Sequence, residues 1–134
     1  MPERRLINKL KNTATITAIV AKQIYPIKQR QGNDKPAITY EVISDQSVNH
    51  STGGTATSSC RVQVDCWAVT YPAVRALANA VKAALLSWSD ATGDPLISSC
   101  HYMNGSDIVE PPNAGQDTVT YRVSQDYLIW YNPA

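Results

Sequence analysis

The chain has 134 residues, of which 43% are hydrophobic and 17% are charged, and its formal net charge at pH 7 is +1. A chain of this length fits a single domain, residues 1–134, and buries roughly two thirds of its unfolded surface on folding, so its core needs no disulfide or metal staple. The near-zero charge gives no general attraction to nucleic acid or to anionic membranes, and no apolar run approaches the ~20 residues needed to cross a bilayer.

The N-terminal segment is predicted to form a short helix. Residues 3–11 (ERRLINKLK) place Leu6, Ile7 and Leu10 at helical spacing, and Pro2 suits a helix start. The segment has no apolar core like that of a signal peptide. We therefore expect a cytosolic chain that begins with a basic amphipathic helix.

The next part of the chain gives a weaker pattern. Residues 13–21 mix threonine and isoleucine, which favour a strand, with alanines, which permit a helix. We interpret them as a second short helix, followed by an extended piece at residues 23–26. The Gly-Asn-Asp content of residues 28–35 predicts a turn or loop.

A strand and a long polar stretch follow. Residues 36–44 (PAITYEVIS) alternate as a strand does. Residues 45–58 (DQSVNHSTGGTATS) contain Val48 as their one sizeable apolar side chain. A loop of this length is uncommon inside a compact domain and is either functional or a solvated hairpin tip, and the sequence leaves both readings open.

Residues 60–69 show the clearest strand pattern in the chain. One face is nearly all apolar and is expected to face the core: Cys60, Val62, Val64, Cys66 and Ala68. The opposite face begins polar and ends apolar, so we expect another element to cover one end of it: Arg61, Gln63, Asp65, Trp67 and Val69.

After Tyr71-Pro72 the period changes to that of an amphipathic helix. Its apolar stripe consists of small and medium residues suited to close packing on a sheet: Val74, Leu77, Ala78, Val81, Ala84, Leu85 and Trp88. The turn SDATGDP, residues 89–95, ends this helix.

The C-terminal third is predicted to be β again. Residues 96–109 carry strand signals interrupted by Asn104-Gly105, which indicates a hairpin or a bulge. Residues 110–117 (EPPNAGQD) form a loop, and residues 119–131 alternate as a long strand. The predicted fold class is α+β: an antiparallel β-sheet with a long amphipathic helix packed on one face and short N-terminal helices.

The cysteines and histidines do not form a metal site by their spacing. Cys60 and Cys66 share a face but lie about 20 Å apart along a strand. Cys100 and His101 are adjacent and point to opposite faces, and His50 lies alone in the polar stretch. The odd count of three cysteines predicts buried, reduced thiols, and we expect no metal and no cofactor.

Catalytic and nucleic-acid-binding patterns are equally weak. The chain has no nucleophile elbow and no phosphate loop. Glu41, Asp65 and Asp126 could converge as a carboxylate cluster, although charged residues on strand faces or at subunit contacts explain them better. The basic residues of segments 3–11 and 28–35 fit solvated surfaces better than a nucleic-acid site. We expect no catalytic residue.

Aromatic composition points toward an interface. The chain has seven tyrosines and three tryptophans but no phenylalanine. Tyrosine and tryptophan combine apolar area with a polar atom and are enriched where proteins meet. Tyr127, Trp130 and Tyr131 close the chain, and Trp67 and Tyr71 lie at the strand-to-helix junction. The excess is typical of a subunit in a symmetric assembly.

Five pieces in order carry a family resemblance: Ile24-Tyr25-Pro26, Pro36, and residues 61–68, 76–85 and 122–131. Together they resemble small tail-completion, or head–tail joining, proteins of long-tailed bacteriophages and prophages, which are related in fold to tail terminators. The match covers nearly the whole chain. The departures are Cys66, where an aliphatic residue is typical, and the long polar stretch 45–58.

The resemblance implies a structural virion protein rather than an enzyme. Similar proteins form a homo-oligomeric ring, a hexamer by this resemblance, at the head-proximal end of the tail. They complete or terminate the tail tube and join it to the head connector, or stopper, in the virion tail after assembly in the host cytoplasm. The expected partners are other copies of the chain, the tail-tube protein and the connector, with no membrane and no specific nucleic acid.

We expect the interface on strand faces and in the two polar loops, 45–58 and 110–117. The candidate interface residues are Arg61, Gln63, Asp65, Trp67, His50, Gly53, Gly54, Asp126, Trp130 and Tyr131. The alternative function is a small nucleic-acid-binding or enzymatic phage-encoded α+β domain.

Overall fold

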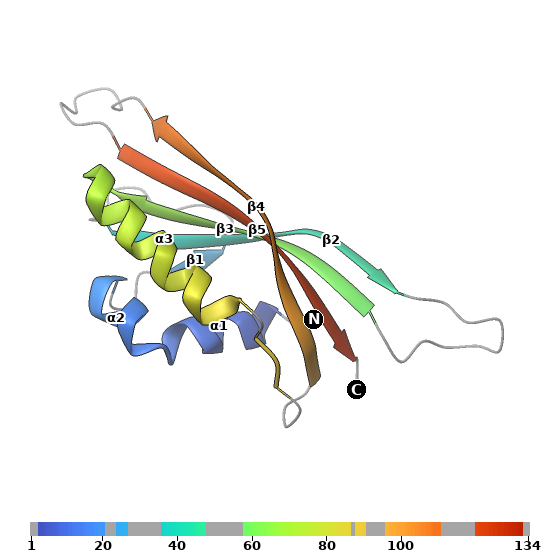
Figure 1. Ribbon diagram of the computed structural model, residues 1–134. Helices are drawn as coiled ribbons and strands as arrows, with labels where there is room; N and C mark the ends of the chain where they lie inside the picture. Colours follow the sequence, from blue (N-terminus) through green and yellow to red (C-terminus); the bar gives the residue numbers. More distant parts are fainter. Residues whose placement is uncertain are drawn as a thin grey trace, which may run out of the picture.

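The computed structural model describes residues 3–20, 24–26, 36–47, 58–86, 88–90, 96–110 and 120–132. Three helices lie on one side of a five-stranded sheet (Figure 1). In chain order the elements are α1 (Glu3–Lys11), α2 (Ala14–Val20), β1 (Ile24–Pro26), β2 (Ala37–Ser47), β3 (Ser58–Ala68), α3 (Tyr71–Leu85), β4 (Leu96–Glu110) and β5 (Thr120–Asn132).

The strands are ordered β1-β2-β3-β5-β4 across the sheet. The four long strands are antiparallel neighbours, which confirms the predicted antiparallel α+β architecture. The extended piece predicted at residues 23–26 is an additional short strand, β1. It pairs parallel with β2, so one edge of the sheet departs from the antiparallel pattern.

Helix α3 begins where the sequence predicted and contacts β3, β4 and β5. Thr70 is its N-cap, and the hydroxyl of Thr70 accepts a hydrogen bond from the backbone N–H of Ala73 at 3.3 Å. Pro72 lies in the first turn, where its missing N–H removes no helical hydrogen bond. The apolar stripe up to Leu85 faces the sheet and is buried, except for the partly buried Ala84.

The same helix is shorter than the sequence predicted. It has 15 residues and ends at Leu85, because Leu86 takes an extended conformation (φ −64°, ψ 122°) while its N–H still bonds to the carbonyl of Lys82 at 2.8 Å. Trp88, the last member of the predicted stripe, therefore lies beyond the helix. It is still only 8% exposed, so the pattern identified a core residue but assigned it to the wrong element.

The core lies between the helices and the inner face of the sheet. The predicted inward face of β3 is buried throughout, as are alternate residues of β5 from Val123 to Tyr131. One polar connection crosses this core: the side-chain amide of Gln125 donates to the carbonyl of Ala78 in α3 at 3.2 Å, and its oxygen accepts from the hydroxyl of Tyr127 at 2.9 Å. The sheet and α3 are thus joined by apolar packing and by a buried hydrogen-bonded chain.

The polar stretch predicted as a loop at 45–58 is partly strand, which corrects the sequence reading. Asp45, Gln46 and Ser47 extend β2 and pair with Cys60, Ser59 and Ser58 of β3. The hydroxyl of Tyr131 also donates to Asp45 at 2.6 Å, so this polar end of β2 is fixed from both β3 and β5. Residues 48–57 lie outside the described residues, as do 111–119 of the second predicted loop, whose first residue Glu110 ends β4.

The strands β2 and β4 each contain a bulge, and the two bulges lie at the same level of the sheet. The register shifts between Val42 and Ser44 in β2 and between Tyr102 and Asn104 in β4. Both shifts adjoin one row of paired residues, Val42–Val62–Tyr127–Tyr102. Bulges increase local twist, and Figure 1 shows the strands crossing at a waist near the middle of the sheet. The Asn104-Gly105 signal is therefore a bulge within one continuous strand and not a hairpin.

Candidate functional site

The side of the sheet opposite the helices, which we call the open face, carries most of the predicted interface residues. Among the described residues no helix covers it (Figure 1). Arg61, Gln63, Asp65 and Trp67 of β3 lie on this face, as predicted, because their neighbours in sequence are buried against the helices. The paired residues of the adjoining strands share it: Thr39 and Glu41 from β2, and Arg122, Ser124, Asp126, Leu128 and Trp130 from β5.

Asp65 is the centre of a polar network on the open face. Its carboxylate lies 3.6 Å from Nη1 of Arg122 on the neighbouring strand. Both of its oxygens accept from Nε2 of Gln63, at 3.1 Å and 3.2 Å. Asp65 is only 8% exposed, and a carboxylate this buried needs such partners because an unpaired buried charge is strongly destabilising.

Trp67 and Arg122 cover this network. The indole N–H of Trp67 donates to the hydroxyl of Thr39 at 2.9 Å, and Thr39 is 1% exposed. The guanidinium of Arg122 lies over the indole ring, 5.1 Å from its centre. The sequence predicted that another element covers one end of this face; the structure shows that side chains of neighbouring strands provide the cover.

A second ion pair lies farther along the same strands. Nη2 of Arg61 is 2.7 Å from Oδ2 of Asp126, and the Arg61 side chain is 44% exposed. The carboxylates considered as a catalytic cluster are therefore separated: Asp65 and Asp126 each pair with their own arginine, and Glu41 lies across Gln63 from Asp126. This arrangement neutralises charge and leaves no pair of carboxylates facing one substrate.

Beyond the ion pairs the open face becomes less polar. Leu128 and Trp130 alternate along β5 and are half-buried. The residues paired with Trp130 are Ser59 and Ser99, both of which have small side chains. The open face thus combines ion pairs with half-buried apolar side chains, which is the composition of many protein interfaces.

Three of the candidate residues lie outside the described part, and one lies on the other side of the sheet. His50, Gly53 and Gly54 fall within residues 48–57, which the structure does not describe. Tyr131 faces the helices and is 5% exposed, so it belongs to the core and not to the open face. Burial and the hydrogen bond to Asp45 raise the pKa of Tyr131 to about 12.

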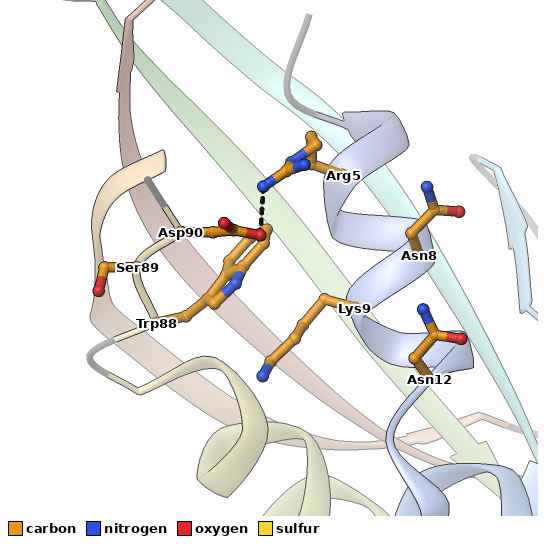
Figure 2. Close-up of a pocket in the computed structure, with 7 residues that line it drawn as sticks. All are labelled: Arg5, Asn8, Lys9, Asn12, Trp88, Ser89 and Asp90. Atoms are coloured by element: carbon orange, nitrogen blue, oxygen red, sulfur yellow. Dashed lines mark ion pairs between the residues drawn. The ribbon is translucent and has the colours of Figure 1, made fainter. Parts of the chain in front are cut away.

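A groove of about 370 Å³ lies between α1 and residues 88–90 (Figure 2). Arg5 forms an ion pair with Asp90 across it, and Lys9 extends toward Trp88 from the same helix. The sequence did not reveal this groove because Arg5 and Asp90 are far apart in the chain and neither belongs to a motif. Its lining amides and cations form no acid–base or nucleophilic pair.

A comparison with protein families identifies the kind of protein. Residues 4–132 match the family described as tail completion protein gp17. The chain belongs to this family. The resemblance found in the sequence is therefore confirmed, and the chain is a structural protein of the phage tail.

The same fold is found in a solved structure. A chain from the virion of a native gene transfer agent particle matches it with a TM-score of 0.67 and 12% sequence identity, over 93% of this chain and 90% of that chain. At this identity the likeness shows the fold alone. No curated protein matches the sequence significantly.

The histidine, cysteine and acidic side chains of the described residues are dispersed over the fold. No group of three or more histidine, cysteine or acidic side chains is placed to hold a metal ion within the described ranges. Cys60, Cys66 and Cys100 are free and buried, and burial raises the pKa of Cys66 and raises that of Cys100 to about 12. None of the described helices is long and apolar enough to span a membrane.

Proposed function

We propose that this protein forms a homo-oligomeric ring, a hexamer by resemblance, at the head-proximal end of the phage tail. There it completes or terminates the tail tube and joins it to the head connector, after assembly in the host cytoplasm. Its work is structural and involves no catalytic residue, cofactor or specific nucleic acid. The family membership of the chain supports this proposal, and the composition of the open face supports the mode of contact.

The observation that carries the proposal is that four charges at the centre of the open face form two ion pairs within the chain. Arg122 pairs with Asp65 and Arg61 pairs with Asp126. A paired charge costs less to bury than an isolated one, because its partner offsets part of the lost hydration. The open face is therefore better suited to contact with an adjoining protein than a face of unpaired charges.

Trp130 supplies the apolar part of that contact together with Leu128. Buried interface centres are rich in tryptophan and depleted in unpaired charge. Trp67 adds a second indole at the other end of the face, held in place by Thr39 and Arg122. We infer that these side chains, with the paired charges between them, form an interface with an adjoining part of the tail.

A pair of matched lysine variants tests the proposed interface. Leu128→Lys places an unpaired charge on the open face, whereas Leu86→Lys changes an apolar residue that is 51% exposed at the end of α3 on the helix side. We expect both proteins to fold, and only Leu128→Lys to lose incorporation into tails, by tenfold or more. Incorporation is measured by immunoblot of purified tails. Equal incorporation of both variants would contradict the assignment of the open face.

A further inference from the structure

The two edges of the sheet have unpaired backbone in the described part of the chain. One edge is the side of β4 that faces away from β5. Among the described residues, this side of β4 pairs only at Ile97, where Asp90 exchanges two backbone hydrogen bonds of 2.9 Å. On the other edge, β1 pairs with β2 only at Ile38–Tyr40, so its described residues do not reach the section that begins at Glu41. Rows of unpaired N–H and C=O groups recognise another extended strand.

The direction of the strands makes these two edges complementary. β2, β3, β5 and β4 alternate in direction, so β2 and β4 run opposite to each other. A second copy placed beside the first in the same orientation therefore presents its β2 antiparallel to β4 of the first. This contact joins two different edges, which is the heterologous geometry that a closed ring requires.

The exposed apolar side chains of the sheet lie at these edges. Ile43 is 46% exposed and lies at the bulge of β2; Met103 is 52% exposed and lies at the bulge of β4. Both bulges adjoin the row that runs from Val42 to Tyr102. When the rows of two copies are aligned, Ile43 of one copy and Met103 of the other lie on opposite sides of the aligned row and are diagonal neighbours across the joint.

The charges at the two edges are compatible with this alignment. Glu41 and Asn104 belong to one row of paired residues across the sheet, and Ser44 and His101 belong to another. When the rows of two copies are aligned, Glu41 of one copy lies opposite Asn104 of the next and Ser44 lies opposite His101, so no like charges are opposed. Asp107, the acidic residue farther along β4, already pairs with Arg75 at 3.1 Å.

We propose that β4 of one copy pairs antiparallel with β2 of the next copy, with Met103 packed beside Ile43, so that the sheet continues around the ring. The proposal rests on the ring of the proposed function and names the surfaces that close it. Because strands twist and bulges increase the twist, each copy is rotated relative to its neighbour at the β4–β2 contact. The repeated rotation bends the row of sheets into a closed ring. The open face stays uncovered by this pairing and is available to adjoining parts of the tail.

Cross-linking between introduced cysteines tests the edge contact. The double variant Ile43→Cys, Met103→Cys is treated with a short bis-maleimide, first as concentrated purified protein and then in tails assembled in producing cells. The native thiols do not interfere because all three are at most 1% exposed. We expect a ladder of covalent multimers on a denaturing gel, and a covalent dimer when the two single variants are mixed.

A control pair gives the test its specificity. Val69→Cys with Met103→Cys combines two positions that are both 52% exposed, but Val69 does not lie in β2. We expect no ladder from this pair. A ladder of similar yield from the control, or dimers from Met103→Cys alone, overturns the proposal; the second result shows a two-fold β4–β4 contact instead.

The same samples separate this inference from the proposed function. Absence of the ladder in both settings, while the protein still incorporates into tails, overturns the edge pairing and leaves the tail role standing. A protein absent from tails even without substitutions overturns the role itself. A ladder in the assembled tails supports both.

Discussion

Removal of the Tyr127 hydroxyl tests the polar connection through the core. Tyr127 is fully buried and Gln125 is 3% exposed, and their hydrogen bond of 2.9 Å satisfies the amide oxygen of Gln125. In Tyr127→Phe that oxygen loses its donor inside the core. A buried acceptor left without a partner costs about 1–3 kcal/mol.

This cost converts to a measurable change in melting temperature. At about 2.1 cal/mol/K per residue, a chain of 134 residues has an unfolding entropy of about 0.28 kcal/mol/K. The expected decrease in Tm is therefore roughly 4–11 °C, measured by calorimetry and confirmed by urea denaturation. The control Tyr121→Phe changes a half-buried hydroxyl and should alter stability by less than about 0.5 kcal/mol.

A double-mutant cycle separates the hydrogen bond from general repacking. Gln125→Met removes the amide while keeping a similar volume, so that Tyr127→Phe in this background no longer strands an acceptor. We expect the two changes together to cost less than their sum by about 1 kcal/mol or more. Additive costs, or a loss in Tyr127→Phe no larger than in the control, would refute the reasoning.

Three further outcomes follow from single features of the fold. The pKa of Tyr131 is raised from 10 to about 12, so its contribution to stability is complete below pH 10 and is lost as the pH rises from 10 to about 12. In the native protein the midpoint of urea unfolding should therefore decrease with pH over this range, and in Tyr131→Phe it should decrease less. An equal decrease in both proteins would contradict this prediction. The buried thiols should react with a thiol reagent only at the rate of unfolding, and rapid labelling of the native protein at pH 8 would contradict their burial. A methyl group at Gly105 would overlap the hydroxyl of Tyr102, whose ring is held edge-on by Tyr127, so Gly105→Ala should cost about 1–3 kcal/mol in denaturant unfolding; a neutral effect would show that Tyr102 moves aside.

Local periodicity predicted the parts of the fold that a single element determines. The alternation in β3 identified its buried face correctly, because a strand with one face on the core must alternate. The stripe of α3 was also correct up to Leu85. It failed at Trp88 because a pattern of apolar residues identifies burial and not the end of a helix.

Nonlocal pairing determined what the sequence pattern did not reveal. Asp45 to Ser47 look like a loop by composition, and they are strand because β3 offers them partners. The open face of β3 was predicted from its alternation, but its partners were not. Arg122 meets Asp65 only because β5 lies next to β3, and that strand order is not encoded in any local motif.

The central claim is that this protein completes the head-proximal end of the tail, and electron microscopy of tails made without it tests that claim most directly. Deletion of the gene should give overlong tails, or tails that fail to join heads, with recovery when the intact protein is supplied. Normal virions with tails of normal length, assembled without the protein, would contradict this role.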